Sequence, residues 1–144
     1  MWTCPHCGRI FAKAKQSHTC QKIPLEQHFQ DKPLAQELFE YLVARLNKDV
    51  GSSTVVSIPC CIHLFGQYDF LAALPKKDRL EVRFALNRVL KSARLKQSVP
   101  LSQTSYKNCL DIWSLNQIDP ELIGWIKESY NLKQTPLTRE PVLV

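Results

Sequence analysis

Four thiol and imidazole side chains near the start of the chain are spaced in a way that constrains how this segment can fold. Cys4 and Cys7 are separated by two residues, and His18 and Cys20 by one. Alternate residues of an extended segment point to the same side, so His18 and Cys20 can face the cysteine pair together. A tetrahedral zinc ion takes four sulfur or imidazole ligands, and a site filled entirely by protein is structural rather than catalytic. The spacing therefore predicts one structural zinc ion bound by Cys4, Cys7, His18 and Cys20.

Residues 1–22 form this predicted zinc knuckle. So short a segment cannot bury enough apolar surface to fold alone, so the metal would supply much of its folding energy. Its first half is similar to that of a two-Cys two-His zinc finger, but His18 and Cys20 are closer together than the two histidines of a finger. A DNA-reading finger helix is therefore not expected. If His18 is not a ligand, His6 and His28 are the substitutes; the remaining alternative is a metal-free segment with free thiols.

The composition is that of an ordinary globular protein. Apolar residues make up 44% of the chain and charged residues 22%, which argues against wholesale disorder. The sequence has no apolar run of the ~18 residues that a transmembrane helix needs, and its first residues lack the pattern of a signal peptide. We therefore expect a cytoplasmic protein without membrane association, whose six cysteines serve as metal ligands and free thiols.

Basic residues gather in two segments of a chain whose net charge is +6. Residues 1–25 contain no acidic residue, and residues 76–96 contain eight basic residues against two acidic ones. Such clusters favour contact with a polyanion such as nucleic acid, although basic residues also occupy ordinary solvated turns and strand faces. The residues expected to contact phosphates are Lys13, Lys15, Lys76, Lys77, Arg79, Arg88, Arg94 and Lys96.

Hydrophobic periodicity predicts an α+β fold for the rest of the chain. Apolar residues recur at helical spacing over residues 33–47 and 120–130, which predicts two main helices. Strand patterns predict a small antiparallel sheet of about four to five strands, over residues 54–58, 61–65, 70–74, 80–86 and 106–113. Residues 87–105 are expected to form an irregular connection. The helices would cover one face of the sheet, in a core domain over residues 23–132 that lies between the knuckle and a flexible tail over residues 133–144.

The remaining cysteines allow two interpretations. Cys60 and Cys61 are adjacent and could form a redox or soft-metal site, with His63 nearby. Their surroundings are apolar, free cysteine behaves as a small hydrophobic residue, and neighbouring residues of a strand point to opposite faces. The sequence therefore favours buried packing for the pair, and the same for Cys109 in its strand pattern.

Several segments together resemble the domain-of-unknown-function 5655 family. They are Trp2-Thr3-Cys4-Pro5-x-Cys7-Gly8-Arg9-x-Phe11, Gln16-Ser17-His18-x-Cys20, His28-Phe29-x-x-Lys32-Pro33 and Trp125-Ile126-Lys127-Glu128-Ser129-Tyr130. The resemblance implies a small bacterial-type protein with a cysteine-rich N-terminal extension. It also implies a core distantly similar to the small α+β domains that include frataxin-like iron-chaperone candidates. This chain departs from an iron-delivery surface, because it is basic and lacks an acidic ridge.

No arrangement of a nucleophile with a base, and no phosphate-binding glycine loop, is recognisable in the sequence. The leading hypothesis is therefore a non-enzymatic, zinc-containing binding protein whose basic surface engages nucleic acid or another polyanion. The alternative is a domain that binds a small molecule or a metal ligand, or an enzyme, with a pocket on the sheet near His63, Tyr68, Arg83 and Tyr106. A protein-interaction adaptor is a third hypothesis if Trp2 or Trp113 is exposed.

Overall fold

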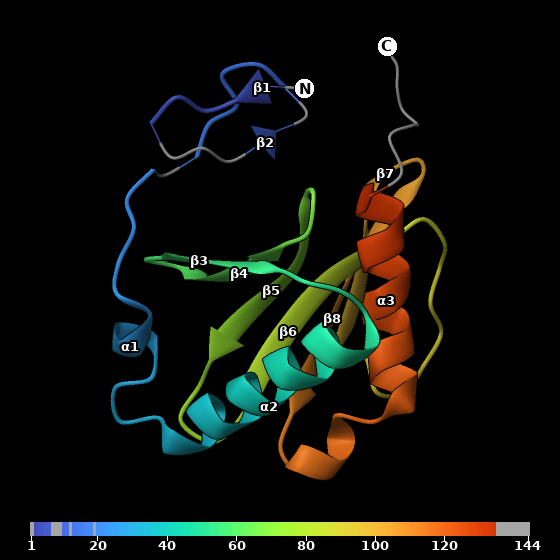
Figure 1. Cartoon of the computed structure of the whole chain (residues 1–144). Coiled ribbons are helices and arrows are strands. Elements are labelled where there is room, and N and C mark those ends of the chain that lie inside the picture. The colour runs from blue at the N-terminus through green and yellow to red at the C-terminus, as the bar shows by residue number, and fades with distance from the viewer. Residues whose placement is uncertain (1, 7–9, 12, 19, 135–144) are drawn as a thin grey trace.

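The computed structural model describes residues 2–6, 10, 11, 13–18 and 20–134, and it has the predicted α+β architecture (Figure 1). A six-stranded antiparallel sheet has the strand order β3-β4-β5-β6-β8-β7. Its strands are β3 (Thr54–Ile58), β4 (Cys61–Phe65), β5 (Asp69–Pro75), β6 (Leu80–Leu86), β7 (Gln97–Ser102) and β8 (Ser105–Ile112). A separate two-stranded sheet pairs β1 (Trp2–Thr3) with β2 (Ile10–Phe11) in the N-terminal segment.

Two long helices, α2 (Pro33–Asp49) and α3 (Pro120–Gln134), cover the same face of the large sheet (Figure 1). Pro33 occupies the first turn of α2, where its missing N–H costs nothing. The carboxylate of Asp119 accepts a hydrogen bond of 3.0 Å from the backbone N–H of Leu122 and so caps α3 as predicted. The short helix α1 (Leu25–His28) and the 3₁₀ turn η1 (Leu115–Gln117) complete the described helices. No described helix is both long and apolar enough to cross a membrane.

The hydrophobic core lies between the helices and the sheet. Alternate residues of β6 point into it, as the sequence pattern predicted, and meet the inward faces of both helices. Twelve large side chains are less than 2% exposed: Leu38, Leu42, Leu46, Ile62, Leu64, Leu71, Leu80, Leu86, Leu110, Ile112, Leu122 and Ile126. Burial on this scale makes the sheet and its helices the rigid frame on which the candidate sites are placed.

The sheet contains one strand that the sequence analysis missed. Residues 97–102 form β7, which pairs antiparallel with β8 within the segment expected to be irregular. Most β7 residues are exposed and the strand contains Pro100, so neither apolar alternation nor composition marks it. Proline is tolerated there because β7 is an edge strand. Helix α3 also runs to Gln134, past its predicted end at residue 130 and into the predicted tail, of which residues 135–144 lie outside the described part.

The N-terminal segment joins the core domain through residues 21–24 and α1. The backbone N–H of Ile23 donates a hydrogen bond of 3.1 Å to the carbonyl oxygen of Ser57 in β3. The rings of Phe29 and Phe39 lie 5.3 Å apart and attach the end of α1 to α2. These contacts place the small sheet of β1 and β2 at the β3 side of the molecule (Figure 1).

Candidate metal centre

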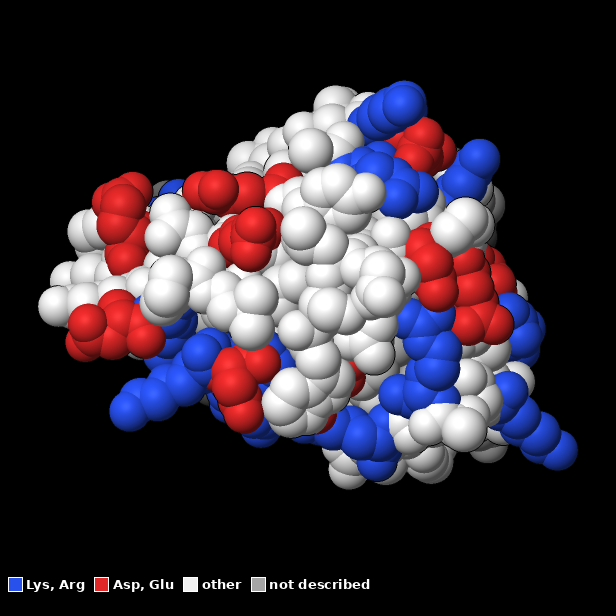
Figure 2. All heavy atoms as spheres, turned by 90° about the horizontal axis from the view of Figure 1, so that it is seen from below, with Lys and Arg blue, Asp and Glu red and all other residues white. Residues whose placement is uncertain are grey.

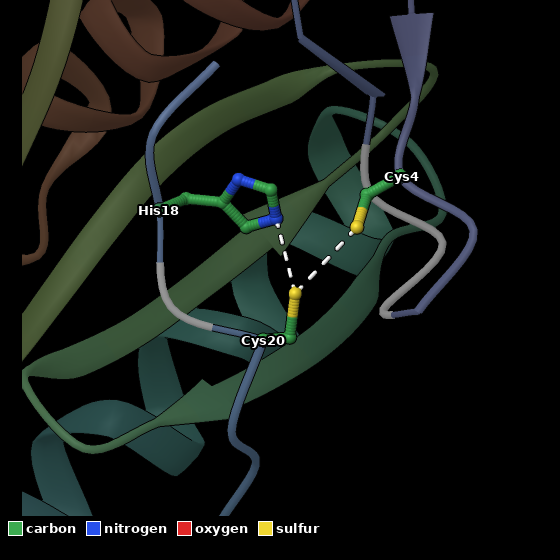
Figure 3. A group of neighbouring side chains, drawn as sticks. All are labelled: Cys4, His18 and Cys20. Carbon is green, nitrogen blue, oxygen red and sulfur yellow. Dashed lines mark hydrogen bonds between the residues drawn. The ribbon is translucent and has the colours of Figure 1, made fainter. Parts of the chain in front are cut away.

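The N-terminal segment brings three of the four predicted zinc ligands together. The sulfur atoms of Cys4 and Cys20 are 3.5 Å apart, and the Cys20 sulfur is 3.3 Å from Nε2 of His18 (Figure 3). All three ligand atoms lie within 4.8 Å of one another. Cys7, the fourth predicted ligand, lies outside the described residues. Two thiols and an imidazole are a donor set that could hold a metal ion.

The local structure turns Nε2 of His18 toward the cysteine sulfurs. Its Nδ1–H donates a hydrogen bond of 2.6 Å to the carbonyl oxygen of Gln16, which leaves the lone pair of Nε2 directed at the cysteines. Its ring lies 4.2 Å from the ring of Phe11 and 6.0 Å from that of Trp2, measured between centroids. The aromatic pair of β1 and β2 therefore packs against the ring, and the Nε2 edge of the ring faces the cysteine sulfurs.

The two substitute histidines are not part of this group. His6 is exposed, whereas His28 is buried among the residues of α1 and β3, where burial lowers its pKa. A buried neutral imidazole next to the backbone of Ile58 is a packing residue. Of the three candidates, only His18 is placed with the cysteines.

The basic residues fall into two groups. Four of the eight predicted phosphate contacts are already in ion pairs with acidic side chains, and Figure 2 shows acidic groups beside many Lys and Arg side chains. The pairs are Arg79 with Asp78 and Asp111, Arg88 with Glu128, Arg94 with Asp119 and Glu121, and Lys96 with Glu81 and Asp111. Within the described residues, the side chains of Lys13, Lys15, Lys76 and Lys77 form no ion pair.

One acidic residue at the centre of this network is itself buried. Glu81 is 4% exposed, and it accepts hydrogen bonds from Lys96 Nζ at 2.8 Å and Arg83 Nε at 2.7 Å. Burial alone would raise the pKa of its carboxyl group, but the two hydrogen bonds and the positive charges outweigh burial and lower it. Lys96 therefore compensates the charge of a buried carboxylate. Contact of Lys96 with an external phosphate would compete with this ion pair.

An open groove of about 260 Å³ lies beside this network. It is lined by Ala93, Arg94, Leu95, Lys96, Asp111, Trp113 and Gln117. The Trp113 side chain is 48% exposed, and the guanidinium carbon of Arg79 lies 5.2 Å from its ring centroid. Trp113 was only a conditional candidate in the sequence analysis, because its contact with Arg79 depends on the pairing of Leu80 in β6 with Ile112 in β8.

The predicted pocket on the sheet is not assembled as one group. Arg83 pairs with Cys109, and Tyr106 with Leu86, in a β6–β8 register without interruption. Leu86 is part of the core, and Arg83 is three positions away on β6, so Arg83 and Tyr106 point to opposite faces of the sheet. His63 shares the Arg83 face, with Ala72 of β5 between them, while Tyr68 lies in the turn before β5.

A second cysteine–histidine group has the composition that the sequence analysis considered as a soft-metal site and placed second to buried packing. The ligand atoms of Cys60, Cys61 and His63 lie within 4.8 Å of one another. The packing prediction is wrong for Cys60, which is exposed in the turn before β4, and confirmed for Cys61 and Cys109, which are buried. Burial, followed by the hydrogen bond with Cys60, raises the pKa of the Cys61 thiol to about 12, which is the reverse of an activated nucleophile.

No protein-family model matches the chain, and no curated protein or solved structure shows significant similarity to it. The fold and the side-chain geometry are therefore the basis of the functional argument, and the resemblance to the domain-of-unknown-function 5655 family stays a prediction.

Proposed function

We propose that this chain is a non-enzymatic binding protein in which one structural zinc ion closes the N-terminal segment and a basic surface engages nucleic acid or a similar polyanion. The observation that carries the zinc proposal is the convergence of Cys4, His18 and Cys20. With Cys7 as the fourth ligand, the protein would fill all four positions of a tetrahedral zinc site.

The sparse packing of the N-terminal segment supports a structural role for the metal. Among its described residues up to Cys20, only Cys4 is buried. The aromatic contacts among Trp2, Phe11 and His18 are too few to stabilise two strands of two residues each. Metal binding would then supply the folding energy of the segment, as in other small zinc modules.

The unpaired lysines support a polyanion as the partner. Lys13 and Lys15 are exposed in the N-terminal segment, and Lys76 and Lys77 lie in the turn between β5 and β6. A cation without an acidic partner can contact a phosphate without first breaking an ion pair. The half-exposed ring of Trp113 adds a surface on which an unpaired base could stack. Single-stranded nucleic acid fits this combination of free lysines and an exposed aromatic ring.

The rival hypotheses receive less support. A small-molecule pocket among the four predicted residues would need Arg83 and Tyr106 on one face, and the strand register separates them. The described groove is open and polar, unlike the enclosed apolar cavities that bind most small ligands. Binding of a metal ligand is favoured by one specific observation, the group around Cys60, which is developed below.

Fluorescence anisotropy with a labelled single-stranded oligonucleotide tests the proposal. We expect binding at low salt that weakens steeply as salt rises, because phosphate contacts release counterions. The matched control is an oligonucleotide of the same sequence with an uncharged backbone, which should bind far more weakly. No binding at low salt, or equal binding of the charged and uncharged oligonucleotides, would contradict the proposal.

A further inference from the structure

We propose that Cys60, Cys61 and His63 form a second metal site, distinct from the N-terminal one, which binds a thiophilic divalent cation such as zinc through three protein ligands and leaves one position open.

The geometry of the turn between β3 and β4 creates this site. Cys60 lies in the turn, and Cys61 begins β4. Because Cys60 is not a strand residue, its side chain is not forced to the opposite face, and its sulfur lies 2.8 Å from that of Cys61. Cys61 and His63 are alternate strand residues and point to the same side, so Nε2 of His63 lies 3.0 Å from the Cys61 sulfur. Both cysteines are free thiols.

The carboxylate of Asp69 lies on the side of the His63 ring opposite to the cysteines. Its Oδ2 is 2.6 Å from Nδ1 of His63, at ion-pair distance though not in line for an ideal hydrogen bond. A carboxylate at Nδ1 favours the tautomer whose proton is on that nitrogen and leaves Nε2 as an electron-pair donor. A β-bulge between Leu64 and Phe65 shifts the register so that Asp69, the first residue of β5, lies within reach. With a metal ion at Nε2, the group would form the carboxylate–histidine–metal arrangement that is common at zinc sites.

The donor set and its exposure define the class of ligand. Two sulfurs and an imidazole favour zinc and other thiophilic cations over calcium or magnesium, which prefer oxygen. Cys60 is exposed while Cys61 is buried, so the group is open to solvent on the side of the turn. The described residues provide three ligands, and zinc sites with three protein ligands keep a fourth position for water or another small ligand. Such a site suits an exchangeable metal, in contrast to a structural ion enclosed by four protein ligands.

Cobalt(II) titration of full-length variants tests this inference. The C4S/C20S variant removes the N-terminal site, and we expect it to bind one equivalent of Co²⁺ with a thiolate-to-cobalt charge-transfer absorption. Adding C60S and C61S should abolish both signals. Adding C109S instead should preserve them, because Cys109 is a buried free thiol outside the group. Asp69→Asn should weaken cobalt binding about 10- to 100-fold, as expected for a residue that positions a ligand.

Two outcomes would overturn the inference: a folded C4S/C20S protein that binds no cobalt, or one that keeps its cobalt after C60S/C61S. If C4S/C20S does not fold, the intact chain decides the question. A decrease from two equivalents to one in C60S/C61S supports the second site, and one equivalent in both proteins refutes it. If only the N-terminal proposal is wrong, the intact chain should bind one equivalent and C60S/C61S none. This result distinguishes failure of the N-terminal site from failure of the second site.

Discussion

Replacing Lys76 and Lys77 with alanine should make nucleic-acid binding less dependent on salt. The size of the change can be estimated from the number of phosphate contacts that are lost. Neither lysine side chain has an acidic partner among the described residues. Each phosphate contact contributes about −0.9 to the slope of log K against log salt on duplex DNA and about −0.7 on a single strand. If both lysines contact phosphates, K76A/K77A should make the slope shallower by about 1.8 on a duplex and about 1.4 on a single strand.

The matched control removes a paired arginine together with its partner. Arg88 donates to Glu128 from Nε and from Nη2, both at 2.9 Å, and the double variant R88Q/E128Q leaves the net charge unchanged. Since this cation is already compensated within the protein, we expect the slope to remain that of the unmodified chain.

Fluorescence anisotropy over a series of potassium chloride concentrations measures both slopes with one labelled oligonucleotide. The reasoning predicts a clear change for K76A/K77A and none for R88Q/E128Q. An unchanged slope in K76A/K77A, or an equal loss in the two variants, would refute the claim that unpaired lysines make the phosphate contacts.

Three predictions concern stability, and urea denaturation measures each of them. Ile126→Ala should cost about 2–5 kcal/mol, because the side chain is fully buried between α3 and the sheet; a cost within error of zero would contradict the described core. Gly51→Ala would place a methyl group 2.7 Å from the Tyr130 hydroxyl and displace its hydrogen bond, with a loss of about 1 kcal/mol, whereas an unchanged midpoint would show that the ring has room to move. The pKa of Glu81 is lowered below 4.5 in the folded state, so its contribution is present above that pH and is lost as pH falls through the folded pKa. Glu81→Gln should therefore flatten the loss of stability in acid, and an unaltered acid limb would count against the buried carboxylate.

The parts of the fold that the sequence predicted are those with strong local patterns. The alternation over Leu80–Leu86 and the helical periodicity after Pro33 depend on burial of one face, and the structure confirms both. Strand β7 was missed because an exposed edge strand needs no apolar alternation. Its pairing depends on backbone hydrogen bonds to β8, which leave no mark in the residue types.

The candidate sites also differ in how far local sequence patterns could predict them. The grouping of His18 with Cys20 could be predicted from their spacing, since alternate residues of an extended segment point to the same side of the chain and can bind one metal ion. The group around Cys60 was considered but not favoured, because neighbouring strand residues point to opposite faces, whereas Cys60 lies in the turn before β4. The proposed role of Asp69 depends on a β-bulge, and the ion pair of Arg88 depends on a partner forty residues away in sequence. Contacts of this kind arise from the tertiary fold.

Zinc content of the full-length C60S/C61S variant, measured by elemental analysis after purification without chelator, tests the central claim most directly. Of the two proposed metal sites, this variant keeps the N-terminal group of Cys4, Cys7, His18 and Cys20. The account predicts about one zinc ion per chain and none after the further replacement Cys20→Ser. A folded C60S/C61S protein without zinc, or zinc that persists after Cys20→Ser, would contradict it.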